Sequence, residues 1–317
     1  MKRILTTIII LLAASVCLAQ TVCEPSGTYL YCQRETGDLY LDVYDPAPGS
    51  ITEIDGIRKP TIIYIFGGGF KGGSRSPQYN SNWFKYLSDA GYSVVAIDYR
   101  LGLRDVTEMG INAKSANLLY NAIQIAVEDL FAATRFLLEN ADQLGINASS
   151  LVISGSSAGA ITALQAEWEI CNGSDIAGIL PEDFNYSGVL AFSGAIYSRS
   201  GAIRYPKTPC PHFLCHGTED KIVPYTQIAL LKQRFAGSDA IAKVLAQNGF
   251  NYQIWRFAGN SHEIANSMVR NLPEEIHFLE DNVVKGTKRN IDATVDDGGI
   301  VVPVWASGDY KKIYEKR

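Results

Sequence analysis

The chain has 317 residues, of which 47% are hydrophobic and 19% are charged. That length and composition allow one large α/β domain or two smaller ones. The formal net charge of -5 provides no basic surface for nucleic acids or anionic membranes, so these polyanions are excluded as expected partners.

The first residues have the pattern of a secretory signal peptide. Met1-Lys2-Arg3 precedes a mostly apolar run to Leu18, and Ala19 supplies a small residue at the cleavage position. The run is short for a membrane span, which takes about 20 residues. We therefore expect residues 1–19 to be removed and the protein to be exported to the periplasm or beyond the cell, without stable membrane insertion. The alternative is lipidation at Cys17, which the bulky preceding Val16 disfavours.

Five cysteines remain after the expected cleavage: Cys23, Cys32, Cys171, Cys210 and Cys215. Disulfides can persist in an exported protein, although an odd number leaves at least one thiol free. We predict a Cys23–Cys32 pair, since the two flank a short segment containing Pro and Gly, but sequence alone does not determine connectivity. No Cys/His spacing resembles a zinc site, and we expect neither a metal nor another cofactor.

Apolar runs rich in β-branched residues alternate with longer segments of helical period, which predicts an α/β fold. A mostly parallel central sheet with helices on both faces is expected. The predicted strands are residues 39–44, 61–66, 93–98, 151–154, 187–192, 211–216 and 251–257. The predicted helices are residues 82–90, 117–140, 158–170, 224–236 and 263–282.

Gly91 and Gly145 follow predicted helices, where a left-handed cap is expected. No repeat and no linker divides the chain, so residues 20–317 are predicted to form a single domain. Residues 285–317 form an extension of unknown role, in which the only apolar run is 300–305. We interpret that run as an extra strand or a partly mobile segment.

The pattern Gly155-Ser156-Ser157-Ala158-Gly159 directly follows the predicted strand 151–154. Gly-x-Ser-x-Gly at the junction of a strand and a helix is typical of a serine nucleophile held at a sharp turn. Small residues at both ends let the backbone turn tightly. Ser157 is therefore the candidate nucleophile.

A serine nucleophile needs a histidine base and a carboxylate that orients the histidine. Of the four histidines, only His262 lies in a loop that follows a predicted strand and precedes a predicted helix. Such loops, at the carboxyl ends of parallel strands, are where these sheets place their sites. The loop after the preceding strand offers Glu219 and Asp220, of which Asp220 is favoured because it stands next to the segment that must approach His262. A loop Asp is otherwise an ordinary turn or helix-cap residue.

The run Gly67-Gly68-Gly69 follows the predicted strand 61–66. An acyl-transfer enzyme needs backbone N–H groups aimed at the oxygen on which charge develops. Three glycines let the backbone approach a substrate closely, although an isolated run of this kind is also consistent with a flexible turn.

Four segments together resemble one known group of proteins. They are Tyr64-Ile65-Phe66-Gly67-Gly68-Gly69-Phe70 with Gly72 and Ser74, Asp98-Tyr99-Arg100-Leu101, Gly155-Ser156-Ser157-Ala158-Gly159 and His216-Gly217-Thr218-Glu219-Asp220. The combination resembles the α/β-hydrolase carboxylesterases, in particular the esterase/lipase group related to hormone-sensitive lipase and the type-B carboxylesterases. The resemblance runs from about residue 39 to 282, and the order Ser157, Asp220, His262 agrees with it.

The resemblance implies that Gly68, Gly69 and Ala158 supply the N–H groups of an oxyanion hole. It also implies a structural role for Asp98 and Arg100. Phe66 departs from the hormone-sensitive-lipase pattern, which usually has His at that position, whereas type-B enzymes carry an aromatic residue there. The subgroup therefore stays open.

The expected function is that of a secreted serine carboxylesterase acting on a small-molecule or carbohydrate-linked ester. Acetyl or feruloyl esters of plant polysaccharides are the substrates that the resemblance suggests. A serine peptidase or thioesterase is the alternative among enzymes, and a non-catalytic binding protein is the alternative outside them. Four aromatic residues are candidates for lining a substrate pocket, although aromatic side chains commonly pack in the core: Trp83, Tyr197, Tyr205 and Tyr225.

Overall fold

The computed structural model describes residues 23–76, 80–110, 112–230 and 232–296. The predicted signal peptide at 1–19, with Cys17, and the apolar run at 300–305 lie outside the described residues. Every helix within the described ranges is too short or too polar to cross a lipid bilayer.

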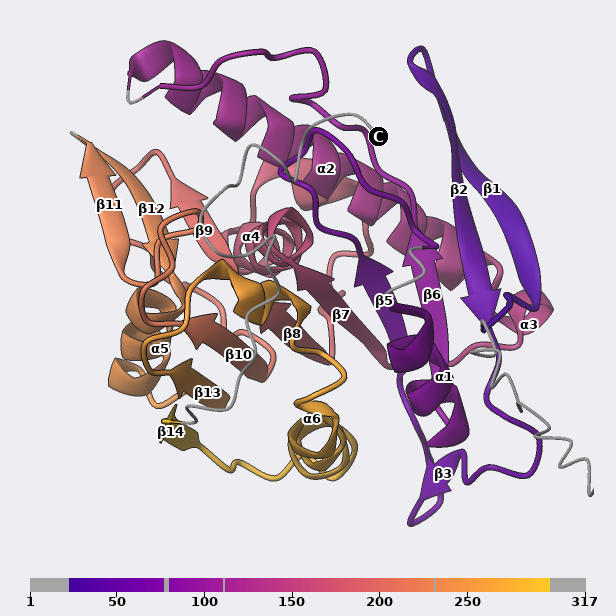
Figure 1. Ribbon diagram of the computed structural model, residues 1–317. Coiled ribbons are helices and arrows are strands. Elements are labelled where there is room, and N and C mark those ends of the chain that lie inside the picture. The colour runs from indigo at the N-terminus through magenta and orange to yellow at the C-terminus, as the bar shows by residue number, and fades with distance from the viewer. Residues whose placement is uncertain (1–22, 77–79, 111, 231, 297–317) are drawn as a thin grey trace, which may run out of the picture.

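A nine-stranded sheet forms the centre of the molecule (Figure 1), in the order β1-β2-β6-β5-β7-β8-β10-β13-β14. Its strands are β1 (Gly27–Arg34), β2 (Gly37–Tyr44), β5 (Thr61–Ile65), β6 (Ser93–Ile97), β7 (Leu151–Ser156), β8 (Gly188–Phe192), β10 (His212–Gly217), β13 (Tyr252–Phe257) and β14 (Ile291–Val295). The pairs β1/β2 and β2/β6 are antiparallel, and all later neighbours are parallel. All seven predicted strands occur, and the expected mostly parallel sheet is confirmed.

Helices cover both faces of this sheet, as predicted. On one face α2 (Ala113–Glu139) packs against α4 (Ala158–Asn172), and on the other lie α1 (Ser81–Asp89) and α6 (Leu272–Phe278) (Figure 1). The helix α4 is buried along nearly its whole length, including the polar side chains of Gln165, Glu167 and Glu169. Strands β5 to β8 and β10 are buried at every position because both their faces are covered.

The remaining elements are short. They are α3 (Ala141–Leu144), α5 (Ser238–Gln247), the 3-10 helices η2 (Asp175–Ile179) and η3 (His262–Asn266), the π-helix η4 (Leu279–Val284), the pair β3 (Glu53–Ile54) and β4 (Ile57–Arg58), and a small sheet of β9 (Ala195–Ser198), β11 (Gln227–Leu230) and β12 (Gln233–Gly237). Gly91 and Gly145 both have positive φ, at 85° and 65°, so the predicted left-handed caps are confirmed.

The predicted helix at 224–236 is wrong, because the structure forms the β11–β12 hairpin there. Residues 228, 231 and 235 are apolar at helical spacing, but all four residues of β11 are exposed, so no apolar helix face is buried. Strand β12 instead pairs with β9, and the Phe235 ring packs against Tyr197, with ring centroids 5.8 Å apart. The helix of this region begins later, at Ser238.

The single helix predicted at 263–282 is also wrong in part, because the structure divides the segment into η3, α6 and η4. Pro273 lies in the first turn of α6. Proline fits the first turn of a helix but breaks its interior, so α6 begins at Leu272 instead of continuing from η3.

The predicted Cys23–Cys32 disulfide is not formed, and both thiols are free. The Cys23 backbone N–H binds the Ser81 hydroxyl at the start of α1, 2.7 Å away, whereas Cys32 lies in β1 opposite Leu39. Cys32 follows Gly27 by five positions in extended β1, roughly 16 Å at about 3.3 Å per residue. A disulfide joins Cα atoms less than about 7 Å apart, and the extended strand carries Cys32 away from the end of β1 that follows Cys23.

The fully buried His212 makes folding stability depend on pH. Its Nδ1 binds the Cys210 carbonyl at 2.8 Å, and burial lowers the pKa of His212 from 6.5 to about 4. Below pH 6.5 the His212 side chain takes up a proton in the unfolded chain but stays neutral in the folded chain, so the free energy of unfolding falls.

Between pH 7 and pH 5 the wild type should therefore lose about 2 kcal/mol of unfolding free energy that the His212→Gln variant does not lose. Urea unfolding at both pH values measures this difference. The exposed His277→Gln variant should track the wild type, and equal pH dependence in all three proteins would contradict the assignment.

Candidate active site

Ser157 occupies the turn between β7 and α4. Its φ of 51° and ψ of -117° lie outside the regions that L residues ordinarily adopt, and α4 begins at the next residue. The backbone N–H of Ser157 donates to the Phe192 carbonyl at 2.9 Å, which ties the turn to the end of β8. Strain held in place in this way is common at functional sites and points to a role for the side chain.

The two glycines of the turn are required by close packing. A Cβ atom at Gly159 would lie 2.0 Å from the Ile65 carbonyl oxygen, and one at Gly155 would lie 2.3 Å from the Gly159 carbonyl carbon. These distances are far below van der Waals contact, so the missing side chain at Gly159 lets α4 approach β5, and the one at Gly155 lets α4 turn back closely on β7.

The structure brings Ser157, His262 and Asp220 together. Each follows the carboxyl end of a parallel strand, β7, β13 and β10 respectively. His262 Nε2 lies 2.8 Å from Ser157 Oγ, and His262 Nδ1 lies 2.7 Å from Asp220 Oδ2. The carboxylate can only accept, so Nδ1 carries the hydrogen and Nε2 presents its lone pair to the Ser157 hydroxyl. This is the tautomer that a general base requires.

Asp220 is buried but remains ionised. Burial disfavours its charge, but hydrogen bonds from His216 and His262 outweigh this effect and hold the pKa of Asp220 well below its usual value. The backbone N–H groups of Ile222 and Val223 also bind Asp220 Oδ1, at 2.9 and 3.0 Å. The neighbouring Glu219 side chain is exposed, so the structure places Asp220, and not Glu219, beside His262.

The predicted glycine loop lies against the serine turn. A Cβ at Gly67 would lie 2.8 Å from Ser156 Oγ and 3.4 Å from Ser157 Cβ. Gly68 and Gly69 have φ of 124° and 63°, which favour glycine. Ala158 stands at the first position of α4, where helix N–H groups have no partner within the helix. The three backbone groups expected from the resemblance therefore belong to segments that border Ser157.

Phe66, directly before the glycine loop, contacts Tyr99 with both its ring and its backbone carbonyl. Its ring centroid lies 4.4 Å from that of Tyr99, and the Tyr99 hydroxyl donates to the Phe66 carbonyl at 2.8 Å. Both side chains are buried. The aromatic residue at position 66 therefore packs in the core beneath the glycines.

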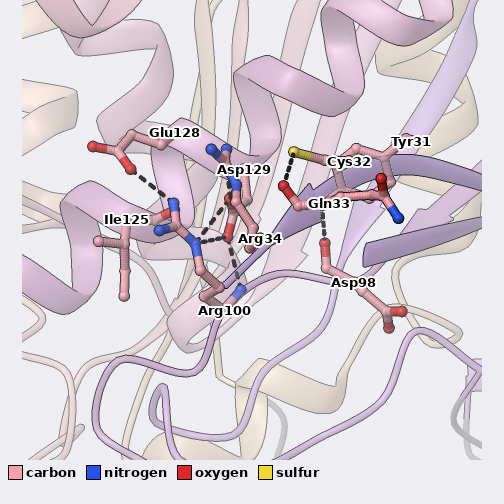
Figure 2. Close-up of polar contacts among 9 residues, drawn as sticks. All are labelled: Tyr31, Cys32, Gln33, Arg34, Asp98, Arg100, Ile125, Glu128 and Asp129. Carbon is pink, nitrogen blue, oxygen red and sulfur yellow. Dashed lines mark hydrogen bonds and ion pairs between the residues drawn. The ribbon is translucent and has the colours of Figure 1, made fainter. Parts of the chain in front are cut away.

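Figure 2 shows Arg100 between two acidic residues of α2. Its Nε lies 2.8 Å from Asp129 Oδ2, and its Nη2 lies 2.7 Å from Glu128 Oε2. Arg34 of β1 binds the fully buried Asp129 as well, at 2.9 Å. The Asp98 carbonyl accepts from the Tyr31 hydroxyl at 2.5 Å. These contacts join β1 and the loop after β6 to α2, and they support a structural role for Asp98 and Arg100.

Three of the four aromatic residues proposed to line a pocket are buried in the core: Trp83, Tyr197 and Tyr205. Trp83 has no exposed surface, and its indole N–H donates to Glu275 at 2.8 Å, linking α1 to α6. The half-buried Tyr225 binds Arg256. Trp83 therefore packs in the core and connects two helices, in agreement with the alternative given for these aromatic residues.

The contact of His216 with Asp220 was not predicted, since the residue entered the sequence argument only through the predicted strand 211–216 and the segment 216–220. His216 Nε2 lies 3.2 Å from Asp220 Oδ2, the same oxygen that His262 Nδ1 contacts. The available signal was its place at the carboxyl end of β10, four residues before Asp220. Among the described residues, no group of three or more His, Cys, Asp or Glu side chains is arranged to hold a metal ion.

Two family models match the chain. One, described as Phospholipase/Carboxylesterase, matches residues 115–280, which include Ser157, Asp220 and His262. The other, described as BD-FAE, matches residues 41–169, which include the glycine loop and Ser157.

The curated relatives that match are esterases. Carboxylesterase 1C of Mus musculus is 31% identical over 124 residues, which are 39% of this chain and 20% of that protein. Fumonisin B1 esterase of Sphingopyxis macrogoltabida is 27% identical over 124 residues, which are 38% of this chain and 21% of that protein. The chain thus spans about a fifth of the length of these curated relatives.

Solved structures match over most of the chain. The apo form of Thermogutta terrifontis esterase 2 has a TM-score of 0.56 at 20% identity, covering 81% of this chain and 96% of that one. The same esterase phosphorylated by paraoxon has a TM-score of 0.54 at 19% identity, covering 80% and 94%. At this level of identity the likeness shows a shared fold.

Proposed function

This chain belongs to the phospholipase/carboxylesterase family, and on that premise we propose that it is an exported serine esterase. The observation that carries the proposal is His262, whose two ring nitrogens lie within 2.8 Å of Ser157 Oγ and 2.7 Å of Asp220 Oδ2. The named relatives are esterases, which supports esters over the amides of a peptidase or the thioesters of a thioesterase.

The proposed reaction begins when Ser157 Oγ attacks the ester carbonyl carbon while His262 Nε2 takes the hydroxyl proton. Asp220 stabilises the imidazolium, which then returns the proton to the departing alcohol. Water attacks the acyl-enzyme with His262 again acting as base, and this step releases the carboxylic acid and restores Ser157. The triad needs no external oxidant or reductant.

The backbone N–H groups of Gly68, Gly69 and Ala158 are proposed to bind the oxyanion. A Cβ at Gly68 would lie 2.1 Å from the Gly72 carbonyl oxygen, so Gly68→Ala should displace this loop. We expect kcat for an aryl acetate to fall about 10²- to 10³-fold, as when one oxyanion donor is lost. Steady-state kinetics measure the fall, and thermal unfolding checks that the fold is retained. Gly49→Ala, at another glycine of positive φ, is the matched control, and equal effects in both variants would contradict the assignment.

Export is proposed from the sequence of residues 1–19. Expression of the full chain with its leader should yield a mature protein that begins at Gln20, as read by N-terminal sequencing. A mature protein that begins at Cys17 with an attached lipid would support the lipoprotein alternative instead, and one that retains Met1 would refute both.

Acetyl or feruloyl esters of plant polysaccharides are the proposed substrates, as an inference from the family resemblance of the motifs. The test compares kcat/KM for aryl acetate, butyrate and octanoate with that for acetylated xylan and methyl ferulate. Preferential release of acetate or ferulate from the carbohydrate or ferulate esters would support this class. No preference over the simple aryl esters would remove it, and no hydrolysis of any ester would refute the proposed function.

A further inference from the structure

A second histidine contacts the carboxylate that orients His262. His216 is fully buried at the end of β10, and its Nε2 lies 3.2 Å from Asp220 Oδ2 and 3.2 Å from the Val223 carbonyl oxygen. Both atoms are acceptors, so Nε2 must carry the hydrogen. Asp220 Oδ2 is therefore contacted by two N–H groups, that of His262 and that of His216, which it shares with the Val223 carbonyl.

The other ring nitrogen fixes the orientation of His216. Its Nδ1 lies 2.8 Å from Ser238 Oγ, and Ser238 is the fully buried first residue of α5. The Tyr225 ring packs edge-on against the imidazole, with centroids 5.7 Å apart. Tyr225 is in turn bound by Arg256, which also pairs with Asp239 at 2.6 Å. The imidazole is thus held on several sides by α5 and the loop after β10.

We propose that His216 is a positioning residue for the ester hydrolysis proposed above, holding the Asp220 carboxylate in the orientation that His262 requires. The inference rests on that proposed function. Asp220 Oδ1 is already occupied by the Ile222 and Val223 N–H groups. The His216 bond completes the set, so rotation of the carboxylate would break hydrogen bonds at both oxygens.

His216 also sets the charge that faces His262. An N–H group that donates to Oδ2 partly neutralises the negative charge of the Asp220 carboxylate. Hydrogen bonding from His216 contributes in this way to the lowered pKa of Asp220. Without this donor, the carboxylate would stabilise the His262 imidazolium more strongly. In a variant that lacks the His216 donor, the rise of activity on the acidic side of the pH profile should therefore occur at a higher pH.

Other ionisable groups also lie near His216. Asp220 and Tyr225 face His216 from the loop after β10, and His262 lies beyond Asp220. Arg256, which binds Tyr225, pairs with Asp239 and Asp292, and Asp239 also pairs with Lys243, so the two positive and two negative charges of this group balance. Neither Arg256 nor Asp239 contacts Asp220 in the described part of the chain. His216 therefore acts on His262 through Asp220.

The decisive variants are His216→Gln and His216→Asn. The Gln amide nitrogen reaches the position of Nε2 and can donate to Asp220, whereas the shorter Asn reaches only the position of Nδ1, beside Ser238. We expect His216→Asn to lower kcat roughly 10- to 100-fold, as for loss of a hydrogen bond to a charged group. KM should be nearly unchanged. The pH midpoint of the acid limb of kcat/KM should increase by about half a pH unit or more. His216→Gln should recover most of both effects.

His212 provides the matched control, since it is a fully buried histidine on the same strand and does not contact Asp220. His212→Asn should keep the wild-type kcat and pH profile. Wild-type kinetics in His216→Asn, the same defect in His212→Asn, or no rescue by Gln would overturn the proposal. If His216→Asn does not fold, Ser238→Ala decides: a shifted acid limb supports the proposal, and a wild-type profile overturns it. Wild-type protein without esterase activity would refute the proposed function itself, which is a separate outcome.

Discussion

Replacement of Ser157 by alanine is expected to lower kcat for an aryl acetate by about 10⁴-fold or more. His262 would then face a methyl group in place of the hydroxyl 2.8 Å away, and no acyl-enzyme could form. The substitution removes a single oxygen atom and leaves the turn intact. Thermal unfolding should therefore stay close to that of the wild type.

The matched control for this variant is Ser154→Ala. Ser154 lies on β7, three residues earlier, and its buried hydroxyl has no hydrogen-bond partner among the described residues. Its removal should leave kcat within about twofold of the wild type, since surface and core changes away from the reacting atoms act mainly on stability. More than a few per cent of wild-type turnover in Ser157→Ala would refute the nucleophile assignment.

Replacement of Asp220 by asparagine is expected to lower kcat by about 10³- to 10⁴-fold. The Ile222 and Val223 N–H groups bind Oδ1 and would hold the amide oxygen at that position. The amide NH₂ would then face His262 Nδ1, where the wild type has an acceptor. This reverses the tautomer, so that Nε2 carries the hydrogen and cannot accept the Ser157 proton.

Steady-state kinetics from pH 5 to 9 measure this effect. The lowered pKa of Asp220 keeps the carboxylate charged throughout that range, so protonation of Asp220 does not complicate the wild-type profile. Glu219→Gln is the matched control, because that carboxylate is exposed one residue away, and it should retain wild-type kcat. A loss of less than tenfold in Asp220→Asn would contradict the role assigned to Asp220.

The sheet core was predictable because its strands are marked by local pattern. Residues 61–65, 93–97 and 151–156 are buried at every position, and they contain the apolar runs 62–65, 94–97 and 151–153. The edge strand β1 was missed although residues 29–32 are apolar, because most of its positions are half-buried or exposed and it lies at the edge of the sheet. The hairpin at 227–237 was missed because its partner, β9, lies some thirty residues earlier in the chain. Helical spacing there carried no information about that pairing.

The candidate site was predictable where chemistry limits the choice of residue type. Ser157 lies in a characteristic motif, and only one of the four histidines lies in a loop between a predicted strand and a predicted helix. The role of His216 was harder to predict, because its place four residues before Asp220 does not by itself show whether the ring contacts Asp220 or, like that of His212, a backbone carbonyl. The absence of the predicted Cys23–Cys32 pair likewise depended on the extended path of β1.

The most direct test of the account is to identify the residue that a fluorophosphonate probe modifies. The probe should attach once per chain, and peptide mass spectrometry should place it on Ser157. Labelling should be lost in Ser157→Ala and strongly slowed in Asp220→Asn. A folded wild-type protein that is not labelled, or that is labelled at a different serine, would contradict the proposal that Ser157 is the nucleophile.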